Sequence, residues 1–93
     1  MSVMTKEEKL AQTTEIVKFL TEKNEEAKKA GIEQHAHFIT SIAYTLGSLI
    51  GFDLKPMGYG PMLSTVIESL TDGIQMAAIE KGVKGTFVKI VRD

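Results

Sequence analysis

Residues 34–52 read QHAHFITSIAYTLGSLIGF, a stretch of nineteen residues without a formal charge when histidine is neutral. Its apolar residues recur three or four positions apart, which is the spacing of one helical face. The opposite face carries small or weakly polar side chains in place of charged ones. Both faces suit burial, and a chain of 93 residues has few elements with which to cover them. The stretch therefore predicts a central helix over about 32–50 and association between copies of the chain.

Gly47 lies inside this predicted helix, where glycine costs about 1 kcal/mol relative to alanine. A close crossing by a second helix would offset that cost. We therefore expect a homodimer or a higher oligomer that packs through this helix and the third one. The predicted interface residues are Ile39, Ala43, Leu46, Gly47 and Ile50.

Length and composition restrict the remaining possibilities. The 93 residues make a single domain, 1–93, and a chain this short buries only about 60–65% of the surface of its unfolded form. Eleven basic and twelve acidic side chains give a net charge of −1, which argues against a general nucleic-acid-binding protein. The chain has no cysteine, so disulfides, thiolate metal sites and cysteine nucleophiles are excluded.

Targeting and membrane signals are weak. The N-terminal residues lack the apolar segment behind a basic start that a secretory signal needs, so we expect a cytoplasmic protein. The uncharged stretch approaches the length of a membrane-spanning helix, which is about 20 residues. Its histidines, hydroxyl side chains and interior glycine make it only mildly hydrophobic, so we expect no insertion into a membrane.

A first helix is predicted over about 5–30. Thr5 and Glu8 form a Thr-x-x-Glu capping box, in which each side chain accepts a hydrogen bond from the other residue's backbone N–H. Further along, positions spaced alternately three and four residues apart form a heptad seam. Asn24 occupies one seam position, where a buried asparagine could pair with the same residue of a second copy and set the register. Its charged neighbours favour the alternative, a place in water beyond the end of the bundle. Gly31 predicts the end of the helix.

The second helix should end at Ile50, because Gly51 repeats the glycine stop signal. Pro61 suits the first position of a third helix over about 61–81, since its fixed φ and missing N–H cost nothing there. The tail, residues 83–93, is rich in β-branched and aromatic side chains. A short strand fits this tail, and so does a fourth helix or an ordered coil.

Few residues of this chain are candidates for metal binding or catalysis. His35 and His37 are the two histidines, and side chains two positions apart on a helix point to nearly opposite sides, so they cannot chelate one ion. We expect one of them to be partly buried and the other exposed. No serine lies in the glycine-flanked turn that exposes a catalytic serine in hydrolases. The carboxylate pair Glu68 and Asp72 is typical of a helix face in contact with water. The pattern predicts no catalytic residue, no metal site, no cofactor and no enzyme.

The segment before the third helix is the strongest candidate for ligand binding. Lys55, Gly58, Tyr59 and Gly60 lead into a helix N-terminus, where free N–H groups and the helix dipole favour an anion. Lys55 can reach a phosphate, and Tyr59 can stack on a base or a sugar. The segment lacks the length and the Lys-Ser/Thr ending of a phosphate-binding loop, so a plain turn between helices is the alternative.

These patterns predict an all-α fold, with a three-helix, bundle-like domain and a short C-terminal tail that is extended or β. Caps, seams and glycine stops of this kind occur in many unrelated helical proteins, so we assign no family. The first functional hypothesis is a small non-enzymatic regulatory or adaptor protein that binds a protein partner as a homo-oligomer. The alternative is a protein that binds or sequesters an anionic, nucleotide-like small molecule at residues 55–61.

Overall fold

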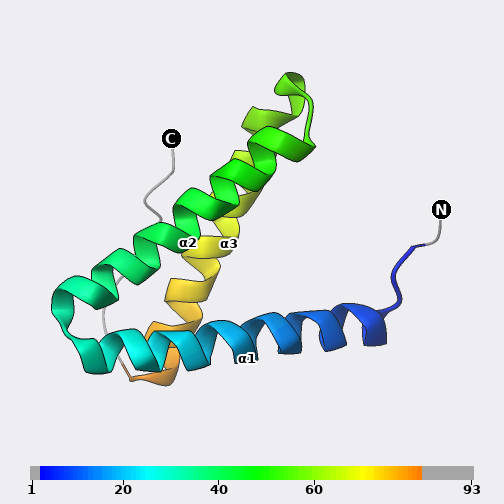
Figure 1. The fold of residues 1–93 in the computed structure, drawn as a ribbon. Coiled ribbons are helices and arrows are strands. Elements are labelled where there is room, and N and C mark those ends of the chain that lie inside the picture. The colour runs from blue at the N-terminus through cyan, green and yellow to red at the C-terminus, as the bar shows by residue number, and fades with distance from the viewer. Residues whose placement is uncertain (1–2, 83–93) are drawn as a thin grey trace. The chain divides into compact units, whose positions relative to one another are not determined.

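The computed structural model describes residues 3–82, and these residues are almost entirely helical. The elements are helix α1 over Lys6–Ala30, α2 over Ile32–Asp53, a short 3-10 helix η1 over Pro56–Gly58, and α3 over Tyr59–Glu80 (Figure 1). The all-α class and the three long helices are therefore confirmed. The predicted tail, 83–93, lies outside the described residues.

Helix α1 begins and ends where its sequence signals place it. Thr5 Oγ1 accepts a hydrogen bond from the Glu8 N–H at 3.0 Å, and Glu8 Oε1 accepts one from the Thr5 N–H at 2.8 Å, which completes the capping box. At the other end, Gly31 donates its N–H to the Lys28 carbonyl at 3.2 Å. The φ of 133° and ψ of 172° at Gly31 fall in a backbone region that is essentially restricted to glycine. This single glycine separates α1 from α2.

Helix α2 continues past Gly51 and does not end at the predicted Ile50. Gly51 fits within the helix, and no atom outside its own turn lies within 4 Å of the position that a Cβ would occupy. Leu54 donates its N–H to the Ile50 carbonyl at 3.1 Å and closes the last turn. Pro56 ends the helix, because the residue before a proline is disfavoured in the α region, and Lys55 has the extended φ of −78° and ψ of 152°.

Helix α3 begins at Tyr59, so that Pro61 is its third residue and not its first. The 3-10 helix η1 runs directly into α3, since Gly58 donates its N–H to the Lys55 carbonyl at 2.8 Å and Tyr59 donates to the Pro56 carbonyl. Pro61 removes no helical hydrogen bond at this position, because the N–H groups of the first helical turn have no acceptor within the helix.

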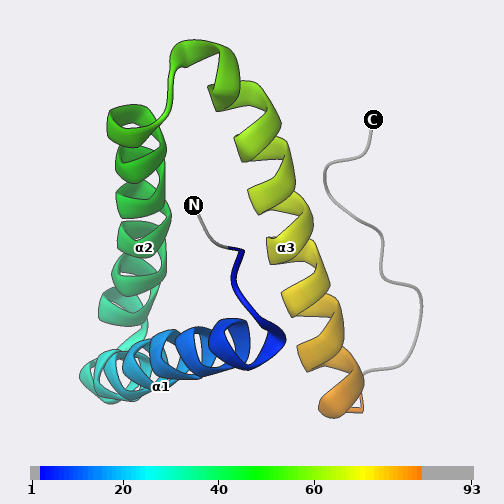
Figure 2. The same cartoon turned by 90° about the vertical axis from the view of Figure 1, so that its right-hand side faces the viewer.

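Contacts divide the chain into two units, Met1–Thr45 and Leu46–Asp93. The first unit contains α1 and the start of α2, which meet in a sharp corner at Gly31 (Figures 1 and 2). The second unit contains the end of α2, η1 and α3. The chain reverses direction at η1, so α3 runs back antiparallel to the end of α2 (Figure 2).

Neither unit has a hydrophobic core among its described residues. No apolar side chain of residues 3–82 is buried, and the buried position in this range is Thr71, which is 3% exposed. The apolar faces of the three helices are half-buried at best and largely exposed. Helices gain most of their stability from packing an amphipathic face, and in the described residues this packing leaves every apolar side chain at least partly exposed.

Candidate functional site

The predicted ligand-binding residues lie on the connection between α2 and α3. Lys55 is exposed between the two helices, and Gly58, Tyr59 and Gly60 run from η1 into the first turn of α3. Gly58 has a helical backbone, with φ −92° and ψ −7°, and neither it nor Gly60 has a positive φ. The structure therefore brings the four residues into one turn, whose two glycines adopt angles open to any residue.

Backbone N–H groups at the start of α3 determine how well this turn could hold an anion. Two of them are used within the 3-10 turn, because Gly58 and Tyr59 donate to carbonyls at the start of that turn. Pro61 has no N–H. Of residues 58–61, Gly60 is therefore the one that has an N–H and does not use it in the 3-10 turn. The turn is a weaker anion site than a helix with a free first turn, and its positive charge comes from Lys55.

Tyr59 has a structural partner that the sequence did not indicate. Its hydroxyl donates a hydrogen bond to the Gly51 carbonyl at 2.9 Å. That carbonyl belongs to the last turn of α2, where the final C=O groups have no partner within the helix. Tyr59 therefore caps the end of α2 from the start of α3, and its side chain is 38% exposed. Sequence reasoning missed this role because it placed Gly51 after the helix.

The predicted interface residues on α2 are all accessible. Ile39 is 52% exposed, Leu46 and Ile50 are half-buried, and Ala43 and Gly47 are exposed. No atom outside the helix's own turn lies within 4 Å of the position that a Cβ on Gly47 would take. Within the described part of one chain, no close helix crossing accounts for this interior glycine.

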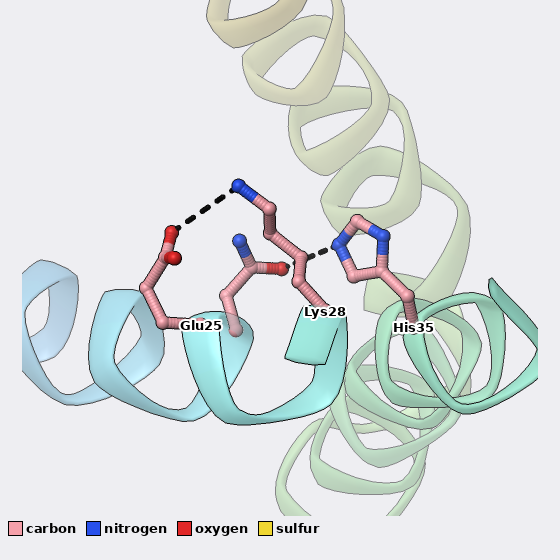
Figure 3. A network of polar contacts seen from close by, with 4 residues as sticks. Glu25, Lys28 and His35 are labelled. Carbon is pink, nitrogen blue, oxygen red and sulfur yellow. Dashed lines mark hydrogen bonds and ion pairs between the residues drawn. The ribbon is translucent and has the colours of Figure 1, made fainter. Parts of the chain in front are cut away.

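A hydrogen bond between α1 and α2 spans the corner of the first unit. Nε2 of His35 lies 2.8 Å from Oδ1 of Asn24, and both side chains are half-buried (Figure 3). The expectation that Asn24 lies in water is therefore wrong, because the chain turns back at Gly31 and brings His35 against it. Beside this bond, Lys28 and Glu25 form an exposed ion pair at 3.4 Å, a kind of contact that adds little to stability (Figure 3).

The two histidines do not share a site. His35 is half-buried and contacts α1, whereas His37 is exposed and its Nε2 lies 3.3 Å from Oγ of Ser41, one turn further along α2. The prediction of one partly buried and one exposed histidine is confirmed. Across residues 3–82, no three His, Asp or Glu side chains are grouped as metal ligands would be.

Comparison with known proteins identifies no relative. No family model, no curated protein and no solved structure matches the chain. Within the range that the structure describes, no helix combines the length and the apolar character needed to cross a lipid bilayer. The residues and geometry of the chain itself are therefore the basis for assigning a function.

Proposed function

We propose that the protein is a small non-enzymatic regulatory or adaptor protein that works as a homo-oligomer and binds a protein partner. The observation that carries this proposal is the lack of any buried apolar side chain in residues 3–82. Hydrophobic burial is the dominant favourable term in folding. A stable fold of this chain therefore needs its apolar side chains to be buried by contacts outside the described part of one chain. Copies of the chain supply that burial to one another by covering their helix faces. On α2 the contact uses Ile39, Ala43, Leu46, Gly47 and Ile50.

The number of exposed apolar side chains supports an assembly of this kind. Nineteen large apolar or aromatic side chains are exposed among the described residues. Covering six half-exposed side chains in each of two copies contributes on the order of 10 kcal/mol. Association costs about 4–15 kcal/mol in lost translational and rotational freedom, so contacts from one helix alone are marginal. The interface therefore extends over α2 and α3, and the helices of neighbouring copies complete a bundle.

The surface that remains outside this interface is suited to a protein partner. Helix α1 carries lysine and glutamate side chains along its whole length, and the ion pairs Lys23–Glu26 and Lys28–Glu25 on it are exposed. Exposed pairs of this kind contribute little to folding, so they are free to exchange for contacts with another protein.

A second candidate function is binding or sequestration of an anionic, nucleotide-like small molecule at residues 55–61. Lys55 supports it, because its exposed side chain stands beside the N-terminal end of α3, whose dipole favours negative charge. Because Gly58 and Tyr59 use their N–H groups within the 3-10 turn and Pro61 has none, such binding depends on the Lys55 charge and on stacking against the Tyr59 ring.

Native mass spectrometry of the purified chain separates the two functions. The main proposal predicts an oligomer whose mass is a whole multiple of the chain mass, with no small molecule retained. An added mass of nucleotide size that disappears in Lys55→Ala would favour the ligand candidate. Lys81→Ala is the matched control, because it removes the same charge at the other end of α3. A monomer without added mass at micromolar concentration would contradict both the oligomer and the retained ligand.

A further inference from the structure

We infer that Gly31 is a hinge, about which α1 and the start of α2 change between the bent form of the structure and one continuous helix. The hydrogen bond between Asn24 and His35 is the latch that holds the bent form. Both helical segments lie in the first unit, Met1–Thr45, so the hinge works within one chain, with or without self-association.

A single residue departs from helical geometry at the corner. Ala30 is the last residue of α1, and Ile32 is the first residue of α2. His35 donates its N–H to the Gly31 carbonyl at 2.9 Å, so this carbonyl already accepts the first hydrogen bond of α2. A change in the φ and ψ of Gly31 therefore joins the two segments, and no other residue has to leave its helix.

The bent form leaves backbone hydrogen bonds unmade. The N–H groups of Ile32, Glu33 and Gln34 have no acceptor in the backbone of the described residues. In a continuous helix they would donate to the carbonyls of residues 28–30, four positions earlier. Lys29 and Glu33 would also become neighbours of opposite charge on one helix face. Straightening therefore gains three backbone hydrogen bonds and a weak charge pair.

The sequence on both sides of the hinge supports a continuous helix. Apart from Gly31, residues 25–34 are alanine, lysine, glutamate, glutamine and one isoleucine, and most of these are strong helix formers. Glycine does not prevent a helix in this chain, because Gly47, Gly51 and Gly73 lie inside α2 and α3. It does weaken a helix relative to alanine, which offsets part of the gain. The bent and continuous forms are therefore close in free energy, as a two-state element requires.

The latch exists in the bent form alone. Nε2 of His35 lies 2.8 Å from Oδ1 of Asn24 (Figure 3). An amide oxygen only accepts, so His35 carries a proton on Nε2 and donates it to this bond. In a continuous helix the two residues would be about 16 Å apart along the axis, and the bond would break. Within residues 3–82 no other side-chain hydrogen bond or ion pair joins α1 to α2, so removal of this bond should favour the continuous form.

A distance distribution between spin labels tests the hinge in the full chain. The labels are placed on cysteines introduced for Glu15 and Thr45, and the labelled protein is diluted with unlabelled wild type so that each distance comes from one chain. A continuous helix separates these positions by about 45 Å, and the bent form holds them closer. We expect the long distance as a minor component of the wild type. Its ratio to the short distance should rise about 2- to 13-fold in Asn24→Ala and in His35→Ala.

Three further variants make this test specific to the latch. Glu25→Ala is the matched control, because its ion pair with Lys28 lies within α1 and persists in both forms, so the ratio should not change. Asn24→Asp keeps an oxygen that accepts from Nε2, so it should retain the bent form. Asn24→Ala combined with His35→Ala should give the same ratio as either change alone, since both remove one bond.

Amide hydrogen exchange distinguishes straightening from loss of structure. The N–H groups of Ile32, Glu33 and Gln34 gain acceptors only when the helix is continuous. Their exchange should therefore slow in Asn24→Ala and in His35→Ala relative to the wild type. A substitution that merely loosened the corner would leave these groups open to water and would not slow their exchange.

The outcomes bear on the hinge independently of the oligomeric state. Unchanged label distances in both latch variants would overturn the inference. Broader, short distances with no slowing of exchange at residues 32–34 would also overturn it, because the corner would then open by unfolding. A long distance that rises in both latch variants, with slower exchange at residues 32–34, would support the hinge even if native mass spectrometry showed a monomer and so contradicted the proposed self-association.

Discussion

Replacing Gly31 with alanine is expected to destabilise the corner between α1 and α2 by about 1–3 kcal/mol. The φ of 133° at Gly31 lies in a region that a residue with a Cβ rarely adopts. An added Cβ would lie 2.8 Å from Oε1 of Gln34, but that atom ends a flexible, exposed side chain that can move aside, so the cost comes from the backbone. Alanine is the strongest helix former, so the variant gains most by joining the two helices into one. That change pulls Asn24 and His35 apart and removes a hydrogen bond worth about 0.5–1.5 kcal/mol.

The distance between fluorophores on cysteines introduced for Glu15 and Thr45 measures this change. A continuous helix would separate the two positions by about 45 Å, and the bent corner holds them closer. We expect the Gly31→Ala distance to rise toward that value. Gly51→Ala is the matched control, because Gly51 lies in a regular helix with open space at its Cβ position. An unchanged distance in Gly31→Ala would show that the corner does not depend on glycine.

Replacing Gly47 with leucine is expected to weaken association between copies by about 1–3 kcal/mol, which is roughly a 5- to 150-fold increase in the dissociation constant. Nothing in the described part of one chain obstructs the new side chain. Leucine also raises helix propensity by somewhat less than 1 kcal/mol, so a protein that worked as a monomer would become more stable. In the proposed oligomer the side chain forces the crossing helix away.

Sedimentation velocity together with urea unfolding distinguishes these two cases. Dissociation with retained helix content supports a crossing at Gly47. A smaller effect is expected for Gly47→Ala, which adds one methyl group at the same place, so the two variants form a graded pair. A Gly47→Leu protein with the native oligomeric state and an unchanged or higher melting temperature would remove Gly47 from the interface.

Sequence signals predicted the parts of this fold whose partners lie a few residues away. The capping box joins Thr5 to Glu8, three positions apart, so both halves were visible in one short stretch. The end of α1 likewise depends on a signal within a short stretch, the single residue Gly31. Near the end of α2 the sequence contains two possible stop signals, Gly51 and Pro56. The helix continues past Gly51 and ends before Pro56. A glycine only permits a helix to end, whereas a proline disfavours the helical conformation of the residue before it.

The contacts that sequence reasoning missed depend on the direction that the chain takes after a turn. Asn24 and His35 are separated by eleven positions, and their hydrogen bond exists only because of the corner at Gly31. The cap from Tyr59 to the Gly51 carbonyl likewise depends on the reversal at η1. Periodicity shows which face of a helix is apolar but not what covers it, so the interface residues of α2 stay a prediction.

We propose that the hydrophobic core of this protein forms only between copies of the chain. Thermal unfolding at protein concentrations about a hundredfold apart tests it most directly, because association stabilises the folded state by mass action. We predict that the melting temperature rises by several degrees with concentration and that helix content falls on dilution. A cooperative transition of a monomer at one concentration-independent temperature would contradict the claim.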